Sequence, residues 1–432
     1  MEQDKKSNAV VLVVDKHSLP VHLATLTAGV KYPVSYDASD QQICYTKEFF
    51  SILADLANIR EGTRVFFYKR RVDEPPEDRG FIGEWEAIKP EGANYVVYED
   101  LHQNLGQADA LILARCLQCG APSSSLKDGK PVCAYCDTSL PGHILPLRFP
   151  LRLVQQFSHY VDDNTAYVDI TDQGRLSTLI FRKVYGAGRE RSVNPILPEE
   201  AEKLRRLLAR AQTQGRNNPV QVPPVSQSHQ PSVQAKSIYN YLNFANPLVL
   251  KRGSACANGS LYNSQGSVVY ETILEFWLMR QLGGNPSFVY DYLNIPKGET
   301  VEWFGNQVLF GIGGEKSDVL VLTRNDEGKR CRAVVIELKR DTIDQQACNQ
   351  IQRYAYWIAQ LVTFQCAHQN PFYITPILIG YKTARGVSSV AGSRFTLPLL
   401  PGAADATLEV IVEPLKILRY RYDFSVGNII LF

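Results

Sequence analysis

Two apolar runs joined by a short polar turn restrict the fold of this chain more than any other feature. Residues 318–323 and 333–339 are rich in Val, Ile and Leu, and the segment 325–328 between them contains Asn and Gly. Runs of this length and composition are typical of buried strands, and a short turn of this kind pairs two strands as a hairpin. We therefore expect an adjacent pair of strands near the centre of a sheet.

The charged residues of this hairpin gather at one end. Asp318 begins the first run, and Glu337 and Lys339 close the second. Strand pairing brings Asp318 near Glu337, and residues two apart on a strand share a face. Carboxylate oxygens are the ligands that Mg²⁺ prefers, and the bound ion activates water for attack on a phosphate. The alternative is a solvated strand face, but charges among apolar residues require a reason.

The order of the surrounding segments resembles the PD-(D/E)XK nuclease superfamily over about residues 236–384. A predicted helix at 267–282 precedes the hairpin, and a long helix is expected at 344–366. The resemblance implies a restriction-endonuclease-like α/β fold and metal-dependent phosphodiester hydrolysis. It implies catalytic roles for Glu271, Asp318, Glu337, Lys339, Gln350 and Tyr354, with Mg²⁺ or Mn²⁺ held by Asp318 and Glu337.

Two details of this resemblance leave alternatives open. Glu271 and Glu275 lie one turn apart on the first helix, so either can supply the helix carboxylate, and Glu271 is preferred. The proline of the superfamily's name is absent, because Ser317 stands before Asp318. The Gln-x-x-Arg-Tyr sequence that ends at Tyr354 also resembles the archaeal and actinobacterial mismatch endonucleases.

Four clustered cysteines predict a structural zinc site. Cys116 and Cys119 form one CxxC pair, and Cys133 and Cys136 form a second pair after thirteen residues. Two such turns supply four thiolates, which close a tetrahedral site and leave no open position for catalysis. We therefore expect a zinc ribbon at 114–138, with unligated buried cysteines as the alternative. The chain has nine cysteines, and the odd total argues against a disulfide framework.

The N-terminal half interleaves aromatic residues with basic ones, at 62–71, 80–86 and 181–191. This combination suits base stacking together with phosphate contact. The segments resemble the PUA-like group, which includes the EVE and YTH domains, and this resemblance implies a cage for a flipped or modified base. Candidate nucleic-acid contacts are Tyr68, Trp85, Arg182, Lys183, Arg189 and Arg191. The alternative is a β-barrel whose aromatic residues belong to the core.

Composition divides the chain into two domains. Residues 1–210 are expected to form a mostly β reader domain, 211–235 a flexible linker rich in Gln, Asn, Ser and Pro, and 236–432 the nuclease. The fold class is therefore mixed α/β and α+β. No Asp or Glu occurs from Lys203 to Tyr270, and this basic tract suits binding to phosphate. A soluble linker next to a helix end is the alternative.

A formal net charge of +2 excludes a uniformly basic coat protein. No apolar run approaches 18 residues, so we expect a cytoplasmic protein without a membrane span. The leading hypothesis is a Mg²⁺-dependent endonuclease for double-stranded DNA in modification-dependent restriction or phage defence. The alternatives are repair of damaged, branched or mismatched DNA and a catalytically silent nucleic-acid-binding protein, and RNA stays open as a substrate. Cutting both strands requires two active sites, which favours a homodimer.

Overall fold

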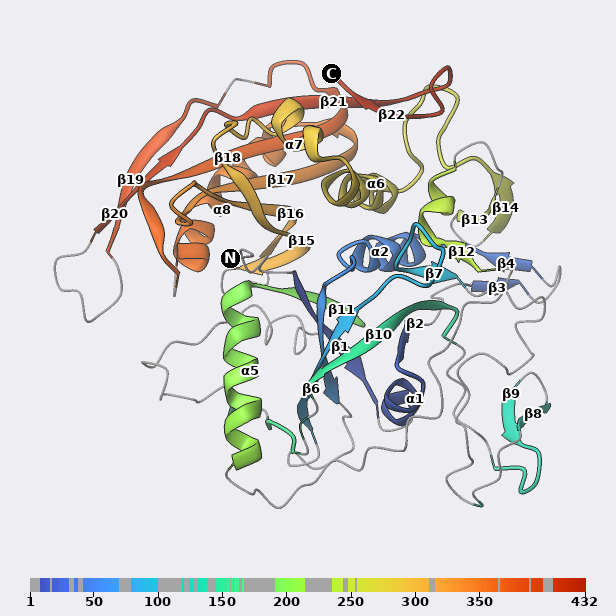
Figure 1. Cartoon of the computed structure of the whole chain (residues 1–432). Coiled ribbons are helices and arrows are strands. Elements are labelled where there is room, and N and C mark those ends of the chain that lie inside the picture. Colours follow the sequence, from blue (N-terminus) through green and yellow to red (C-terminus); the bar gives the residue numbers. More distant parts are fainter. Residues whose placement is uncertain are drawn as a thin grey trace. The chain divides into compact units, whose positions relative to one another are not determined.

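The computed structural model of the chain describes residues 8–15, 18–30, 35–37, 42–69, 79–99, 119, 124–127, 130–138, 145–155, 157, 159–162, 165–166, 191–213, 235–243, 248–252, 255–310, 315–363, 366–387, 390–398 and 407–432. Two compact units are present. The N-terminal unit comprises Ser7–Pro33 and Ile59–Asn240, and the C-terminal unit comprises Val34–Asn58 and Tyr241–Phe432. Each unit contains one eight-stranded sheet (Figure 1). The mixed α/β prediction is confirmed at this level.

The sheet of the N-terminal unit has the order β11-β1-β5-β6-β10-β7-β12, and β2 also pairs with β10. Its strands are β1 (Ala9–Val14), β2 (Thr27–Val30), β5 (Arg64–Lys69), β6 (Gly80–Ala87), β7 (Tyr98–Glu99), β10 (Leu147–Gln155), β11 (Val193–Ile196) and β12 (Lys236–Ser237). Strands β1 and β5 are parallel, and the other pairs are antiparallel. Helix α1 (Ser18–Thr25) follows β1, and β8 (Ser124–Lys127) and β9 (Lys130–Cys133) form a separate hairpin.

Helix α5 (Pro198–Thr213) closes the core of the N-terminal unit. Its leucines, Leu204, Leu207 and Leu208, pack in one cluster with Phe66 and Phe81 of the sheet. Acidic residues begin the helix and Arg210 lies in its last turn, as the helix dipole favours. Helix α5 continues three residues into the predicted linker, whose residues 214–234 lie outside the described part of the chain.

The sheet of the C-terminal unit has the order β15-β16-β17-β18-β20-β19, with β21 paired to both β18 and β22 (Figure 1). Its strands are β15 (Thr300–Phe310), β16 (Glu315–Arg324), β17 (Arg330–Ile343), β18 (His368–Thr383), β19 (Ser393–Pro398), β20 (Thr407–Val412), β21 (Lys416–Asp423) and β22 (Asn428–Leu431). The two predicted apolar strands are β16 and β17, which pair antiparallel within this sheet. They are buried over their shared length because Val, Ile and Leu fill both faces.

Three helices of the C-terminal unit are described between Glu271 and Thr363. These are α6 (Glu271–Gly284), α7 (Pro286–Tyr292) and α8 (Gln345–Thr363). The helix predicted at 267–282 begins four residues later than expected, because Tyr270 has extended backbone angles, φ −129° and ψ 140°. Glu271 is therefore the first helical residue. Helix α8 packs on β17 and β18, and α6 contacts β15 and β17.

A segment from the first part of the sequence completes the C-terminal unit. It contains β3 (Ser35–Asp37), β4 (Gln42–Cys44) and α2 (Lys47–Leu56), which packs against α6. Tyr45 exchanges backbone hydrogen bonds with Val249 and Lys251 next to β13 (Leu248–Arg252) and β14 (Ala255–Gly259). The predicted assignment of all residues 1–210 to one domain is therefore corrected for this segment. No pattern in the sequence indicates that residues 34–58 pack with the C-terminal unit.

Cys44 and Cys256 form a disulfide that ties this segment to β14. The odd cysteine total argues against a disulfide framework, but it does not exclude this single bridge. In the described part of the chain, no helix is both long enough and apolar enough to cross a membrane.

Candidate active site

The pairing of β16 and β17 stops where the charged residues begin. The ladder ends at Val319 opposite Ile336, so Asp318 and Glu337 come directly after the last pair. The backbone N–H of Leu338 donates a 2.8 Å hydrogen bond to Oδ2 of Asp318. A side chain thus replaces the next ladder bond, and the two strands separate. This fork fixes the Asp318 carboxylate beside β17.

Glu337 lies deep in the fork, with 4% of its surface exposed. Its Oε1 accepts a 2.9 Å hydrogen bond from Nζ of Lys339, which shares its strand face. Its Oε2 is buried and has no hydrogen-bond partner within the described residues. A buried carboxylate oxygen without a partner is costly. It is an available ligand atom for a cation.

Glu271 brings a third carboxylate to the same place. It begins α6, and its Oε2 accepts a 2.9 Å hydrogen bond from the backbone N–H of Arg340. Burial and the neighbouring charge of Asp318 raise the pKa of Glu271 above its ordinary value. The charge of Glu271 in turn contributes to the raised pKa of Glu337. The structure therefore brings together Glu271, Asp318, Glu337 and Lys339, as the sequence pattern predicts.

Glu275 lies elsewhere. It is 2% exposed, and its Oε1 accepts a 2.7 Å hydrogen bond from Nδ2 of Asn306. The same nitrogen donates to Oδ1 of Asp55 on α2, also at 2.7 Å. Of the two helix carboxylates that the sequence left open, the structure places Glu271 at the fork and Glu275 in this separate buried network.

The electrostatics of the fork are dominated by crowded, buried carboxylates. Burial, followed by the charge of Asp318, raises the pKa of Glu337 to about 7. Burial also raises the pKa of Asp318. Burial alone would lower the pKa of Lys339, but the three surrounding carboxylates raise it. Burial raises the pKa values of all three carboxylates, and repulsion from Asp318 raises those of Glu271 and Glu337 further, so the cluster favours binding either a proton or a metal ion near neutral pH.

Helix α8 directs Gln350 and Tyr354 toward this cluster. Nε2 of Gln350 donates a hydrogen bond to the Tyr354 hydroxyl. Tyr354 is 2% exposed, and burial together with the charges of Glu337, Glu315 and Asp318 raises its pKa. The Gln-x-x-x-Tyr pair therefore acts as a unit near the fork, with the amide orienting the phenol.

Gln307 is a site residue that the sequence analysis missed. Its Nε2 donates a 3.0 Å hydrogen bond to Oδ1 of Asp318, so both oxygens of that carboxylate are held by protein donors. Gln307 has a φ of +50°, which is uncommon for a residue other than glycine. It lies between the register pairs Asn306–Val319 and Val308–Ser317. No sequence signal marks it, because only the register of β15 brings it opposite Asp318.

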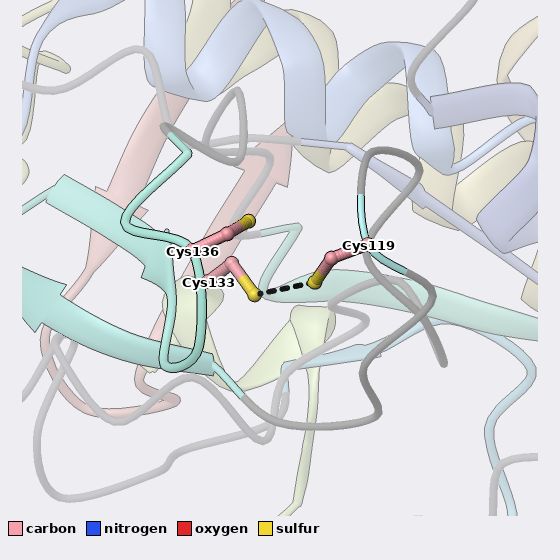
Figure 2. A group of neighbouring side chains, drawn as sticks. All are labelled: Cys119, Cys133 and Cys136. Carbon is pink, nitrogen blue, oxygen red and sulfur yellow. Dashed lines mark hydrogen bonds between the residues drawn. The ribbon is translucent and has the colours of Figure 1, made fainter.

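The predicted zinc ligands are partly described. The sulfur atoms of Cys119, Cys133 and Cys136 lie within 4.8 Å of one another, and Cys116 lies outside the described residues (Figure 2). Cys119 and Cys133 sulfurs are 3.5 Å apart. Hydrogen bonds with Thr138 lower the pKa of Cys136 to about 6, which favours the thiolate. Three converging sulfurs, one with a lowered pKa, fit the donor set that zinc prefers.

The predicted aromatic contacts of the N-terminal unit need correction. Tyr68 is fully buried in the cluster beneath α5, and Trp85 is 2% exposed. The Trp85 ring lies against Gly83, where a Cβ atom would come within 1.9 Å of it. Both aromatic side chains are core residues, so neither presents a face for stacking on a base. Arg191 is partly buried, whereas Arg182, Lys183 and Arg189 lie outside the described residues.

Two members of the predicted basic tract also have internal roles. Lys203 is 5% exposed, and Arg205 donates to the buried carboxylate of Glu84 at 2.6 and 2.9 Å. Arg205 also pairs with Glu202. The start of the tract is therefore committed to α5 and the sheet rather than to phosphate.

No protein-family model matches the chain, and no curated protein matches it. Among solved structures, the chain is similar to a hypothetical protein from Leishmania major, with 13% identity, a TM-score of 0.27, and coverage of 49% of this chain and 98% of that one. It is similar to human THYN1 in complex with 5-methylcytosine containing DNA, with 14% identity, a TM-score of 0.24, and coverage of 48% and 98%. It is also similar to an EndoMS–dsDNA2 complex, with 20% identity, a TM-score of 0.15, and coverage of 23% and 36%. At these TM-scores, the similarities carry no argument about function.

Proposed function

We propose that the C-terminal unit is a metal-dependent nuclease that hydrolyses phosphodiester bonds in double-stranded DNA. The observation that carries the proposal is the fork itself. Asp318 is held by Gln307 and by the backbone of Leu338. Next to it, the buried Oε2 of Glu337 is left without a hydrogen-bond partner among the described residues. A buried carboxylate oxygen without a hydrogen-bond partner is a suitable ligand for a cation.

The donor set fits Mg²⁺ or Mn²⁺. Asp318, Glu337 and Glu271 would supply hard oxygen ligands, which these ions prefer. When bound, the ion lowers the pKa of a water molecule and stabilises negative charge on the phosphate. The raised pKa values of Glu337 and Asp318 also favour a bound cation, because positive charge relieves the repulsion between these two carboxylates.

The chain's own residues orient the reaction. Nζ of Lys339, 2.9 Å from Glu337, is positioned to donate a hydrogen bond to the attacking water or to a phosphate oxygen. Glu337 accepts a hydrogen bond from Lys339 through Oε1, so it would hold the ammonium group beside the ion that its Oε2 would bind. Gln350 and Tyr354 lie on α8 beside the fork, and the hydrogen bond from the Gln350 amide fixes the orientation of the Tyr354 hydroxyl.

We propose that the zinc ribbon is structural, with Cys116 as the fourth ligand of Cys119, Cys133 and Cys136. The N-terminal unit would select the DNA site, by its modification or its shape, and the C-terminal unit would cut it. This division suits modification-dependent restriction or phage defence in the cytoplasm, and a homodimer would cut both strands. A catalytically silent nuclease fold is the less favoured alternative, because the side chains that catalysis would need are all present at the fork. These are Glu271, Asp318, Glu337 and Lys339.

Cleavage of a supercoiled plasmid tests this function. The purified chain with Mg²⁺ is expected to nick or linearise the plasmid, and EDTA should stop the reaction. A plasmid carrying modified cytosines, compared with an unmodified one of the same sequence, tests selection by the N-terminal unit. If neither plasmid is cut with Mg²⁺ or Mn²⁺, the nuclease proposal fails. Equal cutting of both plasmids rejects only the preference for that modification.

A further inference from the structure

The turn between β21 and β22 displays two large apolar side chains to solvent. Phe424 is 59% exposed and Val426 is 66% exposed. The turn is nevertheless well fixed, because Oδ1 of Asp423 accepts hydrogen bonds from the backbone N–H groups of Ser425 and Val426. Gly427, with a φ of +70°, donates its N–H to the backbone oxygen of Asp423 at 2.8 Å. An exposed apolar tip that is held rigid indicates a contact surface.

Phe424 belongs to a three-ring cluster. Tyr262 and Tyr422 stack with centroids 3.8 Å apart and an interplanar angle of 14°. Phe424 meets both rings edge-on, at 5.1 and 5.2 Å. The two tyrosines therefore support the ring of Phe424 from below, while more than half of its own surface stays open. A supported, exposed ring is suited to stacking on a planar partner.

The surroundings of this cluster carry positive charge. Residues 419–432 contain Arg419 and Arg421 but only one acid, Asp423, which is used in the turn. Arg419 and Arg421 are exposed. Residues 255–270, which supply Tyr262, contain no acid at all. Residues 255–270, the last part of the basic tract, thus pack against a basic, aromatic hairpin. This combination complements nucleic acid rather than an apolar protein surface.

The hairpin is joined to the fork through the backbone of Arg340. The N–H of Tyr422 donates to the backbone oxygen of Gly266 at 2.8 Å. The hydroxyl groups of Ser267 and Tyr420 donate to the backbone oxygen of Arg340, at 3.3 and 2.5 Å. The N–H of Arg340 is the group that holds Glu271. One short chain of hydrogen bonds therefore links the aromatic tip to a carboxylate of the fork.

We propose that this hairpin is a DNA-contact element, in which Phe424 stacks on a base exposed near the cleavage site and Arg419 and Arg421 contact neighbouring phosphates. The proposal rests on the proposed function and deepens it, because it names a part of the C-terminal unit that would engage the substrate. Its ligand is an unstacked DNA base. A second copy of the chain and a partner protein are the occupants that the test must exclude.

DNA binding without cleavage provides the test. The full-length chain in Ca²⁺ is titrated with a labelled duplex that carries one unpaired 2-aminopurine, and with a fully paired duplex of the same sequence. Phe424→Ala is expected to weaken binding to the first duplex roughly 5- to 150-fold, the range for loss of one base–aromatic stack. It should also restore the 2-aminopurine fluorescence that stacking quenches. Phe424→Trp should keep the affinity within about threefold, because a ring is retained.

Val426→Ala is the matched control, because Val426 is at least as exposed in the same turn but has no ring. It should change the affinity less than about threefold. The inference is overturned if Phe424→Ala binds like the wild type, or if both variants lose affinity equally. It is also overturned if the wild type dimerises and Phe424→Ala makes it a monomer.

The outcome is distinguishable from failure of the proposed function. A chain that loses DNA affinity through Phe424→Ala but never cuts DNA keeps this inference and loses the nuclease proposal. If the wild type cuts DNA but Phe424→Ala binds DNA normally, the nuclease proposal is kept and this inference is lost. Absence of any DNA binding by the wild type rejects both.

Discussion

Nδ2 of Asn58 donates a 2.8 Å hydrogen bond to Oδ1 of Asn306, although 248 positions separate the two residues. Asn306 also holds Asp55 and Glu275, and it directly precedes Gln307, which holds Asp318. Helix α2, from the first part of the sequence, is thereby fixed to the strand that supports the fork. The proposed nuclease is therefore assembled from two distant segments of the chain.

Weakening the contact between α2 and α6 should destabilise the C-terminal unit. Leu53 is fully buried on α2, so Leu53→Ala should lower the free energy of unfolding by about 2–5 kcal/mol. Lys47→Ala on the same helix is the control, because the Lys47 side chain is 59% exposed. Urea unfolding of both variants measures the difference. Equal stabilities would show that α2 adds nothing to this unit.

A fragment spanning residues 236–432 tests the same point from the other side. It lacks α2 and the partner cysteine of Cys256. We expect this fragment to unfold without a cooperative transition, and a version with residues 34–58 fused to it to recover one. Far-ultraviolet circular dichroism during heating distinguishes the two. A cooperative transition in the fragment alone would contradict the assignment of α2 to the C-terminal unit.

Gln307 should matter for catalysis through its amide. Loss of a hydrogen bond to a charged group is worth about 1.5–3 kcal/mol, so Gln307→Ala should slow DNA cleavage roughly 10- to 100-fold. Gln307→Gly provides the comparison, because glycine accepts the φ of +50° without strain. Both variants should be slow. Full activity in the glycine variant would mean that the backbone angle, and not the amide, is what the site requires.

Metal affinity should depend on pH. Burial and the charge of Asp318 raise the pKa of Glu337 to about 7, so below pH 7 a proton occupies the carboxylate that a cation would use. The apparent affinity for Mg²⁺ should fall by up to about tenfold for each pH unit below 7 and level off above about pH 8. Calorimetric titration between pH 5.5 and 8.5 measures it. An affinity that is constant over this range would contradict the proton-linked site.

The same shift predicts the sign of a stability change in metal-free protein. The pKa of Glu337 is raised above its ordinary value of 4.5, so the folded state binds the extra proton between about pH 4.5 and 7. Stability therefore falls as pH rises through this window, and the cost is fully present above pH 7. Glu337→Gln should raise the melting temperature at pH 8 and leave it nearly unchanged below pH 4.5. A lower melting temperature at pH 8 would reverse the account of the fork.

Zinc should be bound by the cysteine cluster and be separable from catalysis. Metal analysis of the purified chain should find one zinc per molecule, and Cys133→Ser should lose it because one of the converging thiolates is gone. Cys366→Ser is the control, since Cys366 lies outside the cluster and its thiol donates to the backbone oxygen of Val362. DNA cleavage with Mg²⁺ should persist in Cys133→Ser. Equal zinc content in the two variants would reject the site.

The local features of the fork could be predicted from the sequence because they depend on neighbours along the chain. The spacing of Glu337 and Lys339 follows from strand geometry, and Asp318 is tied to them by a short hairpin. The order of the helices and strands from Glu271 to Tyr354 could be predicted for the same reason. Helix α6 begins four residues later than the sequence predicts because the apolar pattern continues through the extended segment before it.

The long-range features could not be predicted. Gln307 and the docking of α2 depend on the register of β15 and on contacts across more than two hundred positions, neither of which leaves a periodic signal. The sequence does not distinguish a buried ring from an exposed one at Tyr68 and Trp85, because an aromatic residue beside arginines has the same sequence pattern in both cases. Only the packing of α5 and the tight approach of Gly83 separate the two cases.

The most direct test of the central claim compares Mg²⁺-dependent DNA cleavage by the wild type, Asp318→Asn and Glu337→Gln. Each variant keeps the shape of its side chain and removes one charge from the fork. Glu327→Gln is the matched control, because Glu327 lies at the exposed opposite end of the same hairpin. We predict at least a hundredfold loss of cleavage in both fork variants, with a preserved fold and near wild-type cleavage by Glu327→Gln. Wild-type cleavage rates in either fork variant would contradict the claim that this carboxylate cluster is the active site.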